Sequence, residues 1–377
     1  MSSNNNASSS DNDAMSSDMA FDRPEISWFG ALCDDDYEFL GVTDERLQSS
    51  WPHCADIVTN ADRLGFDNVL LPSGYDLGMD TTSFAAAIAT HTEQIQLLAA
   101  VRMGEMWLPQ LARQLATIDQ MANGRLTINI ISSDIPGAPL ESAPRYQRTR
   151  EWMHVLRALL NGESIDFQGE FVQLTVDPPR MRTVSGNSPP FYFGGFSPAA
   201  KDTAAEHADV FLTWPDTVAG VGATIEDMAK QADGYGRTLK YGLRAHVIVR
   251  ETESEARDAA TRLLSKLDDE EGEKIRQKSL DTASAGVARQ NELRDASEDD
   301  GFVESNLWTG VGRARSGAGA AIVGDPDQVL AKLRAYQGVG VGAFILSGYT
   351  HIGEADLFAK YVLSNMDHGP LYEGSST

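Results

Sequence analysis

Short apolar runs alternate along the chain with longer segments in which apolar residues recur every three or four positions. Each short run fits a buried strand, and the runs begin at Ile26, Phe66, Ile95, Arg125, Phe191, Val210, Leu243 and Ala343. The longer segments have the periodicity of helices that pack one face on a sheet, and they cover residues 47–64, 82–91, 108–122, 146–160, 198–207, 225–235, 253–266 and 326–337. The chain is therefore expected to repeat a strand–helix unit.

Eight such units with nearly continuous apolar strands predict an α/β fold, a (β/α)8 TIM barrel with insertions, in place of an open doubly wound sheet. No Gly-x-Gly-x-x-Gly motif stands between a strand and a helix, so the usual mark of a dinucleotide-binding fold is missing. We expect a disordered Ser/Asn/Asp-rich leader over residues 1–25, the barrel over 26–366 and a flexible tail over 367–377. Two insertions interrupt the barrel: about 161–190, with a small hairpin, and 267–319, a charged and then Gly-rich stretch expected to be a lid.

The chain has 377 residues and a formal net charge of −24, with acidic residues along its whole length and in patches at 34–36 and 268–271. This charge repels polyanions, which argues against nucleic acid and anionic membranes as partners. Lysine is scarce beside arginine, and with the acid excess this composition is typical of a halophilic protein. No apolar run is long enough to span a bilayer, and the N-terminus lacks the apolar core of a signal peptide. We therefore expect a cytoplasmic protein.

Cysteine chemistry is not expected to dominate. Cys33 and Cys54 are the only cysteines, too few for a disulfide framework or a metal site, so we expect both to be reduced and no metal to be bound. His53 beside Cys54 has no evident third partner for nucleophilic catalysis.

Charged and polar side chains follow the predicted strands at the end where a β/α barrel keeps its active site. Strand alternation places Arg244 and His246 on the same side of their strand. Two interpretations are open: a structural ion pair with a neighbouring carboxylate, or an anion-binding arginine beside a proton-transfer histidine. Tyr349, after the last strand, either donates a hydrogen bond to a bound oxygen species or only packs. Arg313 and Arg315 lie on the Gly-rich segment and fit a phosphate or sulfonate clamp.

A second group of residues fits the binding of an anion or a cofactor. Ser197 precedes a helix that begins with proline, and Gly195 before it allows a backbone to approach closely, although a simple tight turn explains the spacing equally well. Asn129 lies inside an apolar strand and needs a partner, which a flavin edge would supply. Arg145 and Tyr146 add hydrogen-bonding groups at the same end of the barrel.

Several ordered blocks of the sequence resemble the bacterial luciferase-like flavin monooxygenases, and most closely the alkanesulfonate monooxygenase branch. The blocks are residues 61–65, 190–195, 212–214, 243–252, 306–324 and 345–351, and the similarity spans roughly residues 26 to 366. The resemblance implies a luciferase-like TIM barrel and reduced FMN (FMNH2) supplied by a separate NAD(P)H-dependent flavin reductase. It further implies that O2 is used to desulfonate an organosulfonate to an aldehyde plus sulfite.

Carried over residue by residue, the resemblance places substrate and oxygen-intermediate groups on Arg244, His246, Arg315 and Tyr349. It places FMN contacts on Asn129, Tyr146 and Ser197, with further support from Arg145 and Gly195. We also expect a homo-oligomer, either a dimer or a tetramer.

Two departures from the sulfonate branch leave the substrate open. The cysteine that follows the second strand in that branch is absent from residues 73–84, and its His-bearing loop after the first strand is replaced by residues 33–37. The alternatives are a related monooxygenase acting on a sulfone or nitrogen heterocycle, a deazaflavin in place of FMN, and a non-catalytic flavin-binding barrel.

Overall fold

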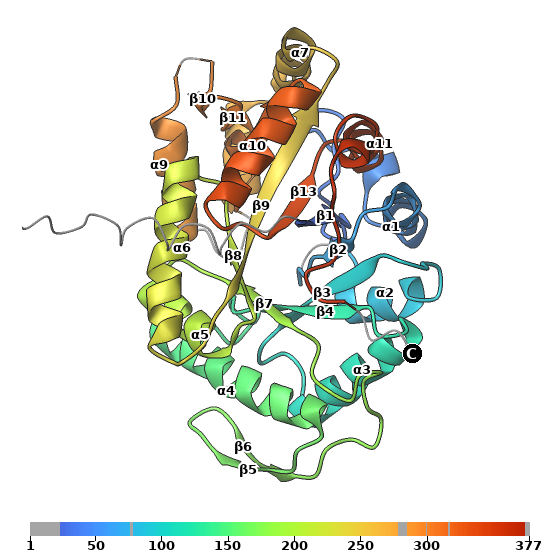
Figure 1. Cartoon of the computed structure of the whole chain (residues 1–377), viewed down its shortest axis with the longest axis vertical. Helices are drawn as coiled ribbons and strands as arrows, with labels where there is room; N and C mark the ends of the chain where they lie inside the picture. Colours follow the sequence, from blue (N-terminus) through green and yellow to red (C-terminus); the bar gives the residue numbers. More distant parts are fainter. Residues whose placement is uncertain (1–22, 76–77, 278–284, 299, 316, 374–377) are drawn as a thin grey trace, which may run out of the picture.

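Eight parallel strands close into a barrel at the centre of the molecule (Figure 1). The computed structural model describes residues 23–75, 78–277, 285–298, 300–315 and 317–373. The barrel strands, in spatial order, are β1 (Glu25–Phe29), β2 (Asn68–Leu71), β3 (Gln96–Arg102), β4 (Leu126–Ile131), β7 (Phe191–Gly194), β8 (Val210–Thr213), β9 (Lys240–Val249) and β13 (Ala343–Ser347). The ring closes because β13 pairs in parallel with β1, with Ile26 opposite Phe344. The predicted TIM-barrel fold and all eight strand positions are thus confirmed.

Helices surround the strands on the outside of the barrel (Figure 1). They are α1 (Trp51–Leu64), α2 (Thr81–Ile88), α3 (Leu108–Met121), α4 (Ser142–Asn161), α5 (Pro198–His207), α6 (Val218–Asp233), α7 (Glu253–Leu264), α10 (Pro326–Gly338) and α11 (His351–Tyr361). Short 3-10 turns occur at Glu45–Leu47, Gly310–Arg313 and Leu363–Asn365. Most predicted helices match within a few residues. Gly65 ends α1 with φ 87°, and Ser197 caps α5 by accepting a hydrogen bond from the Ala200 amide at 3.2 Å.

The first insertion contains the expected hairpin, formed by β5 (Ile165–Gln168) and β6 (Gln173–Val176), which projects from the outside of the barrel (Figure 1). The second insertion, expected to be a lid, is built from regular elements: α8 (Asp269–Gln277), α9 (Ala285–Asp295), β10 (Phe302–Glu304), β11 (Leu307–Trp308) and β12 (Ala321–Gly324). β12 pairs in parallel with the second half of the long β9, so this small sheet extends directly from the barrel. Phe302, Trp308 and Val311 belong to a separate cluster of buried apolar side chains. Burial of this cluster stabilises the insertion.

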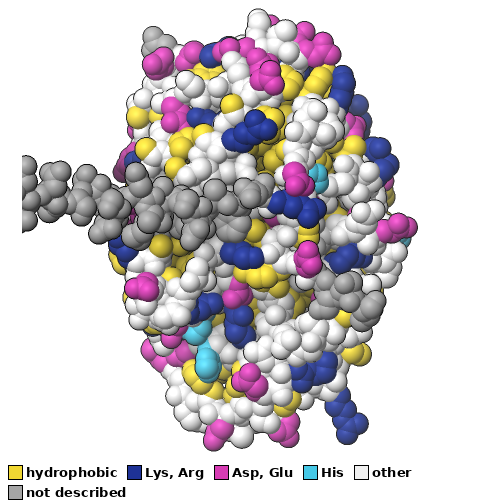
Figure 2. Space-filling view, in the orientation of Figure 1, with side chains coloured by type: hydrophobic (Ala, Val, Ile, Leu, Met, Phe, Trp, Pro, Cys, Tyr) yellow, Lys and Arg dark blue, Asp and Glu magenta, His cyan; other side chains and the backbone are white. Residues whose placement is uncertain are grey.

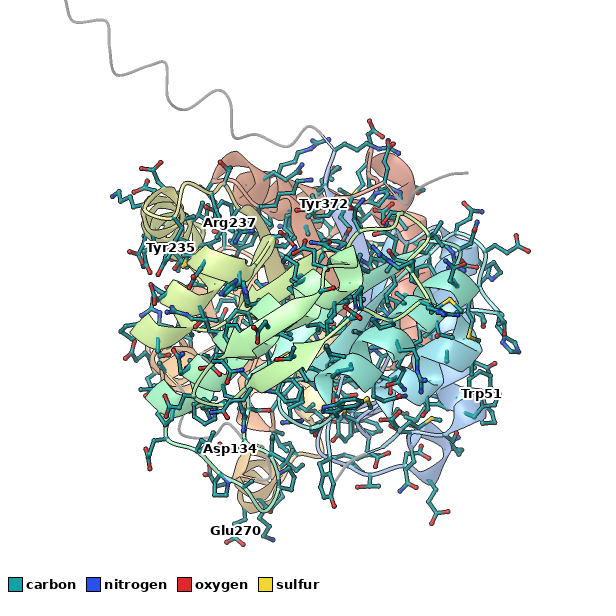
Figure 3. The ribbon with its side chains drawn as sticks, turned by 90° about the horizontal axis from the view of Figure 1, so that it is seen from below. Trp51, Asp134, Tyr235, Arg237, Glu270 and Tyr372 are labelled. Atoms are coloured by element: carbon teal, nitrogen blue, oxygen red, sulfur yellow. The ribbon has the colours of Figure 1, made fainter. Side chains whose placement is uncertain are left out.

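The N-terminal end of the barrel is filled and covered. Tyr192 donates a hydrogen bond to the buried Glu25 at 3.1 Å, and Glu25 also accepts one from the Leu371 amide. Lys240 donates to the carbonyl of Leu371 at 2.6 Å and lies over the ring of Tyr372. Residues 367–373, expected to begin a flexible tail, therefore pack under the barrel because Leu371 and Tyr372 find partners there. Figure 3 shows Tyr372 at the end of the molecule opposite Asp134, which leaves the other end of the barrel for a site.

Acidic and basic side chains are interspersed over the face shown in Figure 2. Among the described helices, none is long and apolar enough to cross a membrane. Within the same residues, no group of three His, Cys, Asp or Glu side chains is arranged to hold a metal ion. Both cysteines are free thiols.

Candidate active site

A buried arginine without a carboxylate partner occupies the C-terminal end of β9. Arg244 is 6% exposed, and its guanidinium donates to the carbonyl of Ala245 at 2.6 Å and to Oγ of Ser347 at 2.8 Å. No carboxylate of the described residues forms an ion pair with it. Burial, followed by the charge of Arg315, lowers the pKa of Arg244 to about 9, which still leaves it cationic at neutral pH. A buried charge in this state is costly unless an anion joins it.

His246 lies on the same side of β9 as Arg244, as strand alternation predicted, because both side chains reach Ser347. Nδ1 of His246 is 2.8 Å from the Ser347 hydroxyl, which stands opposite His246 in the β9–β13 register. Burial, reinforced by Arg244 and Arg315, lowers the pKa of His246 well below its usual value, while the backbone of Ala318 acts in the opposite direction. The imidazole is therefore neutral. Nε2 is buried and has no hydrogen-bond partner within the described residues.

A second cation reaches this end of the barrel from the Gly-rich segment. Arg315 donates from one terminal nitrogen to Oδ2 of Asp35 at 2.7 Å and to the Tyr349 hydroxyl at 2.9 Å. Burial lowers the pKa of Arg315, but Tyr349 and Asp35 outweigh it, so the net direction is upward. The segment returns on itself through a hydrogen bond from the Gly312 amide to Gly319 at 2.8 Å. Arg315 is thus paired with a carboxylate, whereas Arg244 has no such partner in the part of the chain that the structure describes.

The loop after β1 carries the acidic cluster of residues 34–36, and two of its three aspartates are buried. Asp35 is 8% exposed and Asp36 is 4% exposed. Asp36 accepts from the amide of His351 at 3.0 Å and lies 3.0 Å from Nε2 of His53. Asp34 exchanges hydrogen bonds with Ser49, in both directions at 2.7 Å. Asp34 and Asp36 therefore hold the loop, and Asp35 alone points to Arg315.

Aromatic rings fill the space around the two arginines. The guanidinium carbon of Arg244 lies 4.6 Å from the centre of the Phe29 ring, and that of Arg315 lies 5.5 Å from it. The ring of Tyr349 is 5.3 Å from His246 and 5.6 Å from His351, with centroids as the reference points. Burial raises the pKa of Tyr349, although Arg315 opposes the shift, so this phenol remains protonated and can donate a hydrogen bond. The four residues predicted for substrate and oxygen chemistry are thus brought together.

The residues predicted to contact flavin gather across the barrel, on β4, α4, β7 and the start of α5. A methyl group on Gly195 would lie 2.5 Å from Cβ of Ala200 and 3.3 Å from the Tyr146 hydroxyl, so only glycine fits there. Arg145 lies over the Tyr146 ring at 5.5 Å and within 3.5 Å of Asp134. They lie beside the N-terminus of α5, which Ser197 caps and Pro198 begins.

Asn129 supplies a further sign that this region receives a ligand. It is 8% exposed on β4, opposite Tyr192 of β7. Its side chain forms no hydrogen bond with any described residue. A heterocycle bearing carbonyl and N–H groups would supply hydrogen-bond partners for this amide.

Other polar groups at the strand ends have structural roles. Arg102 binds Ser133 and the carbonyl of Asp134. Trp214 packs against Phe196 with ring centres 6.0 Å apart. Gly286 of α9 lies against the Trp214 ring, where a Cβ atom would not fit. Arg313, considered as a second member of the clamp, is exposed. Sequence reasoning missed the roles of Ser347, Phe29 and Asp35; their only signals were positions near strand ends and, for Asp35, the Asp-rich loop.

A closed (β/α)8 barrel with buried cations, a neutral imidazole and a tyrosine at the C-terminal ends of its strands defines an enzyme of the TIM-barrel class. The chain belongs to the luciferase-like monooxygenase family, which it matches over residues 39–343. It is accordingly a flavin-dependent monooxygenase, and the resemblance found in the sequence is confirmed.

Two curated relatives are similar over nearly the whole chain. The sulfoquinovose monooxygenase of Novosphingobium aromaticivorans is 63% identical over 360 residues, covering 94% of this chain and 99% of the relative. The sulfoquinovose monooxygenase of Agrobacterium fabrum is 49% identical over 348 residues, covering 92% and 90%, respectively.

Solved structures with the same fold include EDTA monooxygenase from Chelativorans sp. BNC1, with a TM-score of 0.75, 15% identity and coverage of 93% of this chain and 96% of that chain. DmoA from Hyphomicrobium sulfonivorans has a TM-score of 0.74, 19% identity and coverage of 94% and 91%. At these identities the likeness concerns the fold alone.

Proposed function

We propose that the protein is the oxygenase of a two-component system that desulfonates sulfoquinovose, the sugar 6-deoxy-6-sulfoglucose. The alkanesulfonate specificity expected from the sequence is replaced by this sugar sulfonate, since the two relatives described above carry that name and one of them is 63% identical. The products would be sulfite and a sugar with an aldehyde at C6. Reduced FMN would come from a separate NAD(P)H-dependent flavin reductase in the cytoplasm, and the oxygenase would assemble as a homo-oligomer.

The observation that carries the proposal is Arg244, a buried cation with no carboxylate among the described residues. A sulfonate is a permanent monoanion and would neutralise this charge. His246 offers Nε2 to a sulfonate oxygen, and Tyr349 offers its hydroxyl. A non-catalytic flavin-binding barrel would not need this cationic end.

The region of Asn129, Tyr146, Gly195 and Ser197 fits FMN. Among the described residues no side-chain hydrogen bond occupies the Asn129 amide, Gly195 leaves room for a ligand, and the N-terminus of α5 suits a phosphate. Arg145 would add positive charge at the same side. When bound, reduced FMN would supply the activation of O2 for oxygen transfer. The chain's own residues orient the sulfonate through Arg244, hold protons on His246 and Tyr349, and exclude water with the aromatic rings of Phe29 and Tyr349.

The test is sulfite release with FMN, NADH and a generic flavin reductase in buffers up to molar KCl. Sulfoquinovose, 1-hexanesulfonate, a sulfone and a nitrogen heterocycle are compared under identical conditions. Sulfite from sulfoquinovose that depends on O2 and on reduced flavin supports the proposal. Oxidation of the sulfone or heterocycle without sulfite release from either sulfonate would contradict it.

A further inference from the structure

We propose that Asp35 selects hydroxylated sulfonates by accepting a hydrogen bond from a substrate hydroxyl on its Oδ1 atom. The proposal rests on the proposed function, and it assigns a specificity role to a loop residue whose sequence signal was only an acidic patch. In this proposal Arg244 binds the sulfonate group, and Asp35 recognises the hydroxylated part of the sugar.

The first observation is the unequal use of the two carboxylate oxygens. Oδ2 accepts from Arg315 at 2.7 Å, whereas Oδ1 is buried and accepts no hydrogen bond within the described residues. An ionised carboxylate can only accept, so Oδ1 needs a donor. Leaving a buried, charged oxygen without a donor is unfavourable. A bound molecule with an O–H group would remove that cost.

The second observation is that Asp35 is held in place from both sides. Asp34 is fastened to Ser49 on one side, and on the other Asp36 is fastened to the amide of His351 at 3.0 Å. The carbonyl of Asp35 itself lies 3.3 Å from Nε2 of His351. The carboxylate therefore presents Oδ1 from a fixed backbone, which is what selective recognition of one hydroxyl requires.

The third observation is the balance of charge. The guanidinium groups of Arg244 and Arg315 and the carboxylate of Asp35 leave one net positive charge, which matches one sulfonate. Asp35 cannot serve as a second anion-binding group, and its pairing with Arg315 makes an uncharged, hydrogen-bonding surface beside the cation Arg244. A polyhydroxylated chain extending from the sulfonate suits that surface better than a bare alkyl chain.

The donor is assigned to the substrate because of where Asp35 lies in the ring of strands. Its loop follows β1, and β7, which leads to the residues predicted to contact flavin, is four strands away from β1 in either direction. Asp35 instead contacts Arg315, which in turn contacts Tyr349. Substrate and flavin would thus enter from opposite sides, with Asp35 on the substrate side.

The experiment compares kcat/KM for sulfoquinovose with kcat/KM for 1-hexanesulfonate on one preparation each of wild type, Asp35→Asn and Asp34→Asn. A ratio taken on one preparation is independent of the fraction of folded enzyme, so a destabilised variant remains informative. We expect Asp35→Asn to lower the ratio by about 10-fold or more, the size expected for losing a hydrogen bond to a charged acceptor. Activity on 1-hexanesulfonate should hold or rise, because the positive charge of Arg315 is no longer offset by a carboxylate. Asp34→Asn, which keeps Oδ1 for Ser49, should leave the ratio within about twofold, below the effect of one hydrogen bond.

Parallel loss of activity on both substrates in Asp35→Asn would overturn the proposal, because it would show that Asp35 only holds Arg315. Weakened binding of reduced FMN in anaerobic titration, with an unchanged ratio, would overturn it by assigning the donor to the flavin. An unchanged ratio together with unchanged flavin binding would leave water as the partner of Oδ1 and would also overturn it. Absence of sulfite from every sulfonate with wild type would contradict the proposed function and this inference together, which separates that failure from the others.

Discussion

The guanidinium of Arg244 and the hydroxyl of Ser347 are 2.8 Å apart, although 103 positions separate them in the sequence. The same hydroxyl lies 2.8 Å from Nδ1 of His246. The arrangement that uses every hydrogen has Ser347 accept from Arg244 and donate to Nδ1, which leaves the ring proton of the neutral His246 on Nε2. Ser347 therefore holds both the guanidinium of Arg244 and the imidazole of His246 in place.

Replacing Ser347 with alanine should impair substrate use without unfolding the barrel. Arg244 loses its only side-chain acceptor among the described residues, and His246 loses its orienting contact. Together these losses cost roughly 1.5–3 kcal/mol, or about 10- to 150-fold in kcat/KM for the sulfonate. The check is steady-state sulfite release, with reduced-FMN binding measured on the same samples. A Ser347→Ala enzyme with normal kcat/KM would show that the link has no catalytic consequence.

Removal of Arg315 should uncouple flavin oxidation from sulfite release and also destabilise the fold. The side chains of Asp35 and Arg315 are only 11% and 19% exposed, so Arg315→Ala leaves a carboxylate buried without its cation. Breaking such a pair costs roughly 3–5 kcal/mol. NADH should still be consumed, with hydrogen peroxide as the product and little sulfite.

The double variant Asp35→Asn with Arg315→Met separates these two effects. It should recover most of the melting temperature, because no unpaired charge is left, while sulfite yield stays low. Recovery of sulfite together with stability would mean that Arg315 acts only through the fold.

Acid should destabilise the protein through His207 at the end of α5. Burial, with His154 and Arg150 acting in the same direction, lowers the pKa of His207 to about 3. Glu206 is 3.6 Å away but does not compensate, because Arg150 binds the same carboxylate at 3.1 Å. In the unfolded chain His207 binds a proton below about pH 6.5, whereas in the folded chain it stays neutral down to about pH 3. The free energy of unfolding is therefore highest above pH 6.5 and decreases as the pH falls toward 3.

The corresponding measurement is urea unfolding at pH 7.5 and pH 5 for wild type and His207→Gln. His207 should account for about 2 kcal/mol of the decrease in the free energy of unfolding between pH 7.5 and pH 5. In His207→Gln the free energy of unfolding should therefore depend less on pH. Equal losses in both proteins would exclude His207 as the source.

Salt should stabilise the protein. The net charge of −24 produces self-repulsion that screening by KCl relieves, so the melting temperature should rise toward molar KCl. A melting temperature that falls steadily with added KCl would contradict the halophilic interpretation.

The barrel was predictable because each strand is a local run of apolar residues. The placement of Arg244 and His246 on the same side of β9 follows from strand alternation alone. The Arg315–Asp35 contact was not predictable, since it joins positions 280 residues apart and depends on how the Gly-rich segment folds back. α8 and α9 were missed because their sequences are mostly polar. α9 is instead held from outside, with Gln290 donating to the carbonyl of Pro215 at 2.8 Å.

The most direct measurement is a crystal structure of the protein with sulfoquinovose and FMN under anaerobic, reducing conditions. The account predicts sulfonate oxygens within hydrogen-bonding distance of the Arg244 guanidinium and of Nε2 of His246, with the flavin phosphate at the N-terminus of α5. A sulfonate bound at Ser197 and Arg145, with Arg244 left without an anion, would contradict it.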